Sequence, residues 1–340
     1  MNAAEPVISA KNVWKLFGQN PKQYLNSMTP NRTYEEIQAD GYIAGVKDVS
    51  IDVGRGEMLV IMGLSGSGKS TLVRCFCRLH EITGGTIEVE GQDIMSMGQQ
   101  QLIDLRRRKM GMVFQSFGLL PHRTVLDNVA FPLQMRGQDR HARRERALEV
   151  IELVGLSGRE DYFPRELSGG QQQRVGIARS LVIEPDIWFL DEPFSALDPL
   201  IRREMQDEFL RLQGMLGKTV VFITHDFDEA LRLADRIAIM KDGAVEQCAS
   251  PGEIVMNPAT EYVRKFTEEI DKSRVVTAAA LAGEGQADGA AVQADATLLS
   301  IARLVMNDTR DFLPVEGSDG ARVGVMKRQE ALDILLGVEQ

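Results

Sequence analysis

The chain carries Gly63-Leu64-Ser65-Gly66-Ser67-Gly68-Lys69-Ser70-Thr71 between a short apolar run at 58–62 and a helical pattern that follows at once. This stretch fits G-x-x-x-x-G-K-[ST], in which glycines let the backbone come close to a ligand. Backbone N–H groups and the helix N-terminus then face an anion. Lys69 adds a point charge for the β- and γ-phosphates, and Ser70 adds a hydroxyl for Mg²⁺. The stretch therefore predicts a phosphate-binding loop for a nucleotide.

Composition limits what else the chain can be. Its 340 residues suffice for about two domains, and a net charge of −10 opposes a general attraction to nucleic acid. Three cysteines form no C-x-x-C pair, so we expect reduced packing residues in a cytosolic protein. The N-terminal sequence lacks the pattern of a signal peptide, and no apolar run approaches about 18 residues, so we expect no membrane span. Any association with a membrane is then expected through a partner.

Apolar runs and helical periodicity alternate along most of the chain. Strands are predicted at 7–13, 46–53, 58–62, 86–89, 110–115, 187–190, 220–223 and 237–240, and helices at 102–109, 124–134, 140–154, 171–182 and 329–336. This alternation is typical of a largely parallel α/β sheet.

Four segments depart from the alternation. The polar stretch 19–44 predicts an inserted loop with a helical turn at 34–39. Residues 116–174 bring helix after helix, which predicts a helical subdomain inserted into the sheet domain. Residues 277–296 are mostly Ala, Gly and small polar residues and predict a linker. Residues 297–340 regain apolar periodicity but are short for an independent core.

Two carboxylates follow the predicted strand at 187–190. Hydrolysis of a nucleotide needs a carboxylate near Mg²⁺ and a group that polarises the attacking water. Asp191 suits the first task and Glu192 the second. Two acids at a strand end are otherwise solvated groups, but behind a phosphate loop they predict a hydrolytic site.

A second anion site is predicted at Leu167-Ser168-Gly169-Gly170-Gln171. Ser168 can cap the helix that follows, which leaves N–H groups and the positive end of the helix dipole exposed. One nucleotide does not need two such ends from one subunit, whereas two copies facing head to tail would supply one each. The pattern therefore predicts a homodimer that encloses the nucleotide.

Together these motifs resemble the ATPase subunit of an ATP-binding cassette transporter over about residues 7–250. The matching features, in the family's order, are the phosphate loop, Gln115, the stretch 167–171, Asp191 with Glu192, Ser195-Ala196-Leu197-Asp198, and His225 in Thr224-His225-Asp226. The resemblance implies an α/β phosphate-loop NTPase fold with an antiparallel β subdomain and the inserted helical subdomain. The ATP-binding cassette domain then comprises 1–276.

The resemblance also implies roles for individual residues. It assigns Glu192, His225 and Gln115 to catalysis, with His225 at the γ-phosphate, and Ser70, Gln115 and Asp191 to Mg²⁺. It assigns nucleotide contacts to Phe17, Gly63, Ser65, Gly66, Ser67, Gly68, Lys69, Ser70, Thr71, Ser168, Gly169, Gly170, Gln171 and Asp198. Phe17 would stack on adenine, with Trp14 as the alternative.

A narrower resemblance points to the glycine betaine/choline/proline importer subfamily. It rests on the inserted loop 19–44 and on the runs 112–122 and 124–129. Those ATPases commonly carry a C-terminal pair of cystathionine-β-synthase-type modules. Here 315–325 resembles the end of one module, and 297–340 has room for only one. Because a pair usually forms the ligand cleft, a remnant that only packs is favoured over a sensor.

The sequence thus predicts an ATPase that energises import of a quaternary amine such as choline, glycine betaine or proline betaine, using ATP and Mg²⁺. It would lie peripherally on the cytoplasmic face of the inner membrane, with permease subunits and an external substrate-binding protein as partners and no nucleic acid. An importer of proline, histidine or another amino acid is the alternative. A soluble ATPase of this fold acting on DNA or ribosomes lacks support, since such proteins tend to have coiled-coil insertions or two cassettes.

Overall fold

The computed structural model describes residues 5–29, 31–268 and 270–337, and residues 1–4, 30, 269 and 338–340 lie outside the described part. The chain divides into two compact units. The first comprises the described residues up to Glu229 together with Met240–Val245, and the second comprises Ala230–Ile239 and the described residues from Glu246 onward. Among the helices described, none is both long and apolar enough to cross a membrane.

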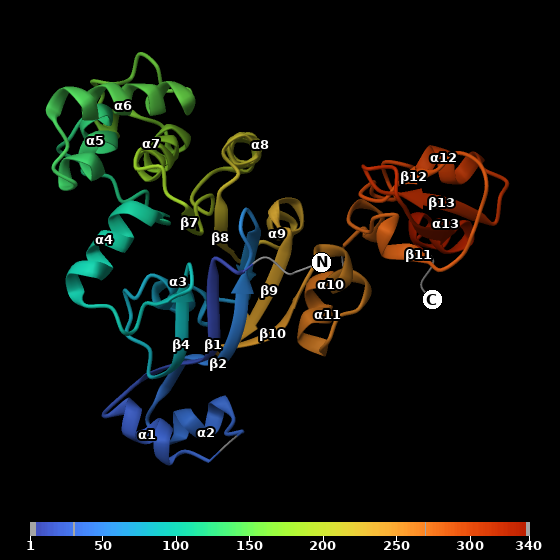
Figure 1. The fold of residues 1–340 in the computed structure, drawn as a ribbon, viewed down its shortest axis with the longest axis horizontal. Helices are drawn as coiled ribbons and strands as arrows, with labels where there is room; N and C mark the ends of the chain where they lie inside the picture. The colour runs from blue at the N-terminus through green and yellow to red at the C-terminus, as the bar shows by residue number, and fades with distance from the viewer. Residues whose placement is uncertain (1–4, 30, 269, 338–340) are drawn as a thin grey trace. The chain divides into compact units, whose positions relative to one another are not determined.

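An antiparallel sheet begins the first unit (Figure 1). Its order is β2-β1-β4-β5, with β1 at Ile8–Phe17, β2 at Ile43–Val53, β4 at Gly84–Val89 and β5 at Gln92–Asp93. In β2, buried residues alternate with exposed ones from Val49 to Val53, as expected when one face of a sheet covers a core. The predicted antiparallel subdomain is confirmed, although β1 extends four residues beyond the predicted end.

A six-stranded sheet has the order β10-β9-β3-β8-β7-β6. The strands are β3 (Met58–Met62), β6 (Met110–Val113), β7 (Ile187–Asp191), β8 (Thr219–Thr224), β9 (Arg236–Lys241) and β10 (Ala244–Ala249). β3, β8, β7 and β6 run parallel to one another. Every residue of β3, β7 and β8 is buried, because helices cover both faces of a parallel sheet. The predicted parallel core is therefore confirmed.

Some helices of the first unit pack on this sheet, and others form the inserted subdomain. They are α3 (Lys69–Phe76), α4 (Gln99–Lys109), α5 (Val125–Met135), α6 (Arg140–Leu153), α7 (Gly169–Leu181), α8 (Pro199–Leu216) and α9 (Phe227–Leu233). α5, α6 and α7 pack against one another, as predicted for the helical subdomain (Figure 1). Side-chain caps from Thr124, Asp139 and Ser168 start these three helices. α7 runs past the predicted subdomain boundary and packs on β6.

The inserted stretch between β1 and β2 is a folded lobe. It contains α1 (Pro21–Ser27), which the sequence analysis did not predict, and α2 (Tyr34–Ala39), which lies where the helical turn was predicted. The rings of Tyr24 and Tyr42 stack with centroids 3.9 Å apart, and Tyr24 and Arg32 both hydrogen-bond to Asp40. The lobe therefore connects the ends of two paired strands through its own small core.

The second unit ends in a four-stranded sheet of order β11-β14-β13-β12. Its elements are β11 (Ala282–Gly283), β12 (Val292–Gln293), α12 (Ala302–Asn307), β13 (Phe312–Glu316), β14 (Arg322–Lys327) and α13 (Arg328–Leu335), preceded by α10 (Pro251–Met256), α11 (Glu261–Thr267) and 3-10 turns at Lys272–Arg274 and Ala279–Leu281.

The segment 277–296, predicted as a linker, differs from that expectation. It supplies β11, β12 and the buried residues Ala278 and Val292 to the core of this sheet. Alanine and valine side chains are small, yet they fill the space against Leu298 and Leu313. Residues 297–337 thus share one core with the stretch before them rather than forming a module on their own.

Four aromatic side chains occupy the space between β7, β8 and α8. Phe209 of α8 lies 5.2 Å from Trp188 and 5.9 Å from Phe222, measured between ring centroids, and Phe194 lies 5.8 Å from Phe222. All four are fully buried. They fix α8, and the turn before it, onto the strands that carry the polar residues described below.

Phe209→Ala should lower the free energy of unfolding of the first unit by about 3–5 kcal/mol, because the cavity it leaves is enclosed by aromatic rings. Urea denaturation followed by the fluorescence of Trp188 measures this. The matched control is Leu200→Ala on the same helix, where the side chain is 70% exposed, and the expected change is within about 0.5 kcal/mol. Equal midpoints for the two variants would contradict the assigned core.

Candidate functional site

The phosphate loop lies between β3 and α3, as its pattern predicts. Gly63, Gly66 and Gly68 have φ angles of 146°, 84° and 101°, a region where a side chain is strained. A Cβ at Gly68 would lie 2.2 Å from the carbonyl oxygen of Gly45. The loop is therefore formed by glycine conformations and by close backbone contact with β2.

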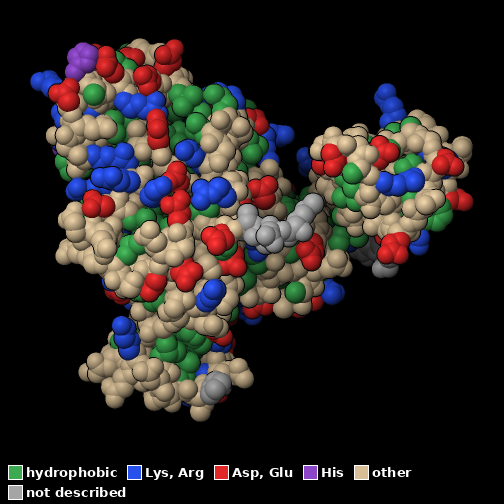
Figure 2. Space-filling model, viewed as in Figure 1, with side chains coloured by type: hydrophobic (Ala, Val, Ile, Leu, Met, Phe, Trp, Pro, Cys, Tyr) green, Lys and Arg blue, Asp and Glu red, His purple; other side chains and the backbone are tan. Residues whose placement is uncertain are grey.

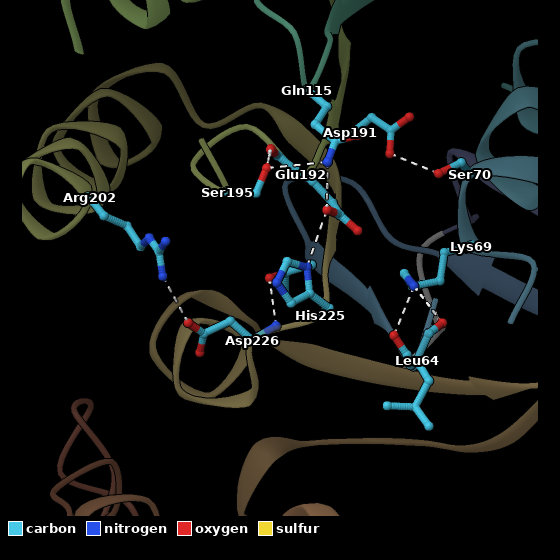
Figure 3. Close-up of polar contacts among 12 residues, drawn as sticks. Leu64, Lys69, Ser70, Gln115, Asp191, Glu192, Ser195, Arg202, His225 and Asp226 are labelled. Carbon is cyan, nitrogen blue, oxygen red and sulfur yellow. Dashed lines mark hydrogen bonds and ion pairs between the residues drawn. The ribbon is translucent and has the colours of Figure 1, made fainter. Parts of the chain in front are cut away.

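Lys69 points back into this loop. Its Nζ donates to the carbonyl oxygens of Gly63, at 2.8 Å, and Leu64, at 3.0 Å (Figure 3). Lys69 is 5% exposed, and burial lowers the pKa of its ammonium group. The negative charges of Glu192 and Asp191 act in the other direction and raise this pKa. A phosphate would offer this buried cation a stronger, charge-assisted partner than a carbonyl.

Ser70 and Asp191 meet across the loop and the end of β7. The Ser70 hydroxyl donates to Asp191 Oδ1 at 3.0 Å. Asp191 is buried, and burial raises the pKa of its carboxyl group while the Ser70 hydrogen bond lowers it. A hydroxyl and a carboxylate are oxygen donors of the kind that a hard divalent cation takes.

Three strand ends bring Gln115, Glu192 and His225 together (Figure 3). Gln115 Nε2 donates to Glu192 Oε2 at 3.1 Å, and His225 Nδ1 lies 3.2 Å from the same oxygen. Glu192 has a φ of 45°, a left-handed conformation that costs of order 1–3 kcal/mol outside glycine. The surrounding structure thus holds this carboxylate in a strained but well-defined place.

Except for Gly63 and Asp191, the residues named above in the loop and at the strand ends line one cleft of about 690 Å³. Its lining comprises Phe17, Ile43, Ala44, Gly45, Leu64, Ser65, Gly66, Gly68, Lys69, Ser70, Thr71, Gln115, Glu192 and His225. Phe17 is 38% exposed at one end, whereas Trp14 packs against the cluster of Leu16, Ile37 and Ala44. Of the two aromatic candidates, the structure brings Phe17 to the cleft.

Several predicted site residues are elsewhere in the described chain. Ser168 and Gln171 form a reciprocal capping box at the start of α7, with Gly169 and Gly170 between them. Asp198 caps α8 by accepting from the N–H of Ile201 at 3.1 Å. None of these five residues lines the cleft just described. The N-terminus of α7, predicted as a second anion site, therefore lies outside the cleft of its own chain.

Gly63 and Ser67, both predicted as nucleotide contacts, instead pack the phosphate loop against neighbouring backbone. Gly63 is packed so that a Cβ would lie 2.2 Å from the carbonyl oxygen of Met240, and Ser67 is buried, with its backbone oxygen accepting from the N–H of Gly243. Neither lines the cleft. They hold the loop in place, whereas the remaining loop residues face the ligand space.

Sequence reasoning missed Ile43, Ala44 and Gly45 of β2 as cleft residues. No motif marks them, but pairing of Phe17 with Ile43 places them beside the aromatic residue. The hydroxyl of Ser195 was matched only as part of a motif, and in the structure it lies 3.5 Å from Gln115 Nε2 and donates to the carbonyl of Glu192 at 3.0 Å. Cys75 and Cys77 are buried, and burial raises the pKa of each thiol to about 12.

We compared the chain with known proteins and found both a matching family and similar proteins. Residues 46–195 match the family model described as ABC transporter. The chain is 76% identical over 332 residues to the trimethylamine N-oxide transport system ATP-binding protein of Ruegeria pomeroyi, covering 97% of each chain. It is 50% identical over 272 residues to the glycine betaine/proline betaine transport system ATP-binding protein of Escherichia coli, covering 80% of this chain and 68% of that one.

A solved structure is similar as well. It is a dimeric ATP-binding cassette in a post-hydrolysis state bound to ADP and Pi. The TM-score is 0.60 at 34% identity, and the match covers 72% of this chain and 98% of that one.

Phe17→Ala should weaken ATP binding by roughly two- to tenfold, because an aromatic stack is worth about 0.5–1.5 kcal/mol. Phe17→Tyr should keep the affinity, and Trp14→Phe should not change it by more than about twofold. Fluorescence anisotropy of a labelled ATP analogue, competed with ATP, gives the three dissociation constants. A larger loss in Trp14→Phe than in Phe17→Ala would exchange the roles of the two aromatic residues.

Proposed function

The chain belongs to the ABC transporter family of ATPase subunits, and from this we propose that it powers import of trimethylamine N-oxide or another small methylated amine. The observation that carries the proposal is 76% identity over 97% of both chains to a protein named for trimethylamine N-oxide transport. Relatives named for glycine betaine, proline betaine and choline transport widen the class to solutes with a fully substituted, polar nitrogen. Proline or histidine import is the weaker alternative.

The cleft supports ATP as the bound nucleotide. The ring of Phe17 would stack on adenine at one end, and the phosphate loop with Lys69 would hold the phosphates. Glu192 would polarise the attacking water, with Gln115 and His225 keeping its carboxylate in place through their contacts at 3.1 Å and 3.2 Å. His225 would then meet the γ-phosphate where the developing charge needs a donor.

Ser70 and Asp191 fit a Mg²⁺ ion, since Ser70 lines the cleft and its hydroxyl donates to the Asp191 carboxylate, so that oxygen atoms of both residues lie together there. Gln115 would reach the same region with its amide oxygen. When bound, the ion neutralises charge on the β- and γ-phosphates.

We further propose that two copies close head to tail around two ATP molecules. The N-terminus of α7 at Ser168–Gln171 is outside its own cleft, and a partner copy could present it to the γ-phosphate. Asp198 would lie at the same junction. The similar cassette that is dimeric with ADP and Pi bound supports a dimer of this chain.

Permease subunits would receive the motion of this dimer, and a substrate-binding protein would deliver the solute to them. The chain would then work at the cytoplasmic face of the inner membrane as a peripheral subunit. ATP favours the closed dimer and hydrolysis releases it, so the work is a population shift between two states.

The solute is tested with the whole complex. Membrane subunits, binding protein and this subunit are reconstituted, and the ATPase rate is measured with each candidate solute. We expect trimethylamine N-oxide or a betaine to stimulate hydrolysis, with proline and histidine as comparison solutes. Stimulation by sugars or peptides and by no methylated amine would overturn the assignment.

Glu192→Gln should slow hydrolysis by about 10²-fold or more, the scale of a general base, while ATP affinity stays near the parent value. The variant should accumulate as an ATP-bound dimer on size exclusion. Lys69→Ala should lose nucleotide affinity and stay monomeric.

Ser168→Arg is the matched test of the composite site. It should bind ATP but fail to dimerise, because a large side chain fills the space where the partner's phosphate docks. Normal dimerisation of Ser168→Arg, together with parental hydrolysis by Glu192→Gln, would contradict the two-copy site.

Truncation after Arg274 should leave the basal rate of ATP hydrolysis within about twofold of the rate of the full chain. This corresponds to a change in the activation free energy of hydrolysis below about 0.5 kcal/mol. The cut removes the C-terminal core as a whole, because every buried member of that core lies between Val276 and Ala331. ATPase rates across a range of salt concentrations measure the outcome. Loss of a salt response in the truncated chain would assign a sensing role to the C-terminal sheet instead of a packing role.

A further inference from the structure

Two polar side chains on α8 face two on the segment that follows β8. Arg202 and Gln206 are four residues apart and so share one face of α8. Asp226 and Glu229 flank the start of α9, directly after His225. We call these four residues the α8–α9 ladder, with Arg202–Asp226 and Gln206–Glu229 as its two rungs.

The first rung is an ion pair that reaches two segments at once. Arg202 Nη1 lies 3.5 Å from Asp226 Oδ2 (Figure 3). Arg202 Nη2 donates to the carbonyl oxygen of Leu197 at 3.1 Å. Leu197 belongs to the turn that contains Ser195. The planar guanidinium group therefore bridges the Ser195 turn and the residue after His225, which a single ammonium group could not do in the same geometry.

The second rung is buried. Gln206 Nε2 donates to Glu229 Oε1 at 2.8 Å, and the two residues are 7% and 5% exposed. Burial raises the pKa of the Glu229 carboxyl group, opposed by hydrogen bonds from Thr224 and Gln206. A buried carboxyl group needs such partners, so removing them has a local cost.

Two hydrogen bonds from backbone N–H groups to side-chain oxygens fix the segment that carries His225. The N–H of Asp226 donates to Thr224 Oγ1 at 3.0 Å, and the N–H of Glu229 donates to Asp226 Oδ1 at 3.1 Å. His225 lies between Thr224 and Asp226 and contacts Glu192 at 3.2 Å. Three ladder residues line one small cavity together with Glu192, Ser195 and His225.

We propose that the four ladder residues are positioning residues. They keep the His225 imidazole in contact with the Glu192 carboxylate and fix its position relative to the Ser195 turn. The inference depends on the roles proposed above for Glu192 and His225. His225 itself is more than half exposed, so its own side-chain packing does little to fix it. The ladder supplies that fixation through Asp226, which directly follows His225, and through Glu229 in the helix that begins there.

A ladder that only braces two helices would affect stability. A ladder that positions the histidine would affect turnover after ATP has bound, because the nucleotide is held mainly by the phosphate loop. The two roles are separated by comparing kcat with KM, together with the melting temperature and ADP affinity of each variant.

Arg202→Ala in the full-length subunit should lower kcat for ATP hydrolysis about tenfold while KM for ATP stays within about twofold. Arg202→Lys should fold normally and lose several-fold in kcat, because it keeps the charge but cannot bridge Leu197 and Asp226. Arg203→Ala and Glu204→Gln, exposed neighbours on α8, are the matched controls and should keep the parental kcat.

The second rung is tested by rescue. Glu229→Ala should lose about tenfold in kcat, whereas Glu229→Gln should recover to within about threefold, since its amide oxygen still accepts from Gln206. In a double-mutant cycle, Arg202→Ala should add less than about twofold to the loss caused by Asp226→Ala, because the two residues act as one pair.

Parental kcat in Arg202→Ala and Arg202→Lys would overturn the inference, as would independent, multiplicative losses in the cycle. A fall in melting temperature with kcat per folded subunit unchanged would assign a bracing role only. Glu192→Gln is measured alongside: if it hydrolyses ATP at the parental rate the proposed catalytic site fails, whereas an inactive Glu192→Gln beside unaffected Arg202 variants rejects the ladder alone.

Discussion

Parallel pairing of β6, β7, β8 and β3 is the constraint on which the cleft depends. In register, Met62 lies beside Thr224, Asp191 beside Ile223 and Val113 beside Leu190. All four strands therefore end at one edge of the sheet, and whatever follows them in the chain is delivered there. Residues more than a hundred positions apart, Ser70 and Asp191, come within 3.0 Å for this reason. The sheet has little polar surface of its own, so the polar groups concentrate at this edge.

Backbone contact between the two sheets makes the edge a cleft rather than a flat rim. Gly68 lies so near the carbonyl of Gly45 that no side chain fits at Gly68, and Gly243 approaches the carbonyl of Ala44 in the same way. The N–H of Lys47 also donates to the carbonyl of Gly243 at 2.8 Å. Through these contacts β2 packs closely against the phosphate loop. The end of β1 lies nearby because β1 pairs with β2. The lobe between β1 and β2 is anchored at Gly18, where the ring of Tyr42 leaves no room for a Cβ.

Local patterns in the sequence were enough to predict the parallel core, the inserted helices and the roles of Lys69, Ser70, Asp191 and Glu192, whereas Gln115 and His225 were assigned through the family resemblance. Asp191 and Glu192 follow an apolar run that indicates a strand, and Lys69 and Ser70 end a glycine-rich loop that follows another such run. The segment 277–296 could not be predicted in this way, because Ala and Gly have weak periodic signals and its two strands are only two residues each. The choice between Trp14 and Phe17 also depended on register, since both are apolar and three residues apart. Gly45 and Arg202 act through partners distant in sequence, which a single chain without its fold does not reveal.

Every charged group at the phosphate end of the cleft already has a partner within the chain. Lys69 is bound by two carbonyls, Asp191 by the Ser70 hydroxyl, and Glu192 by Gln115 and His225. Binding of a nucleotide is therefore an exchange of partners, and its net gain comes from replacing neutral acceptors of Lys69 with charged phosphate oxygens. Glu192 would lose one of its two contacts during this exchange only if the side chain of His225 or Gln115 turned toward the phosphate. Since both contact the same carboxylate oxygen, movement of either one changes the hydrogen bonding and the orientation of Glu192. In the proposed mechanism, binding and activation would be linked through this oxygen atom, and the link would require that the segment carrying His225 keep its place while its side chain turns.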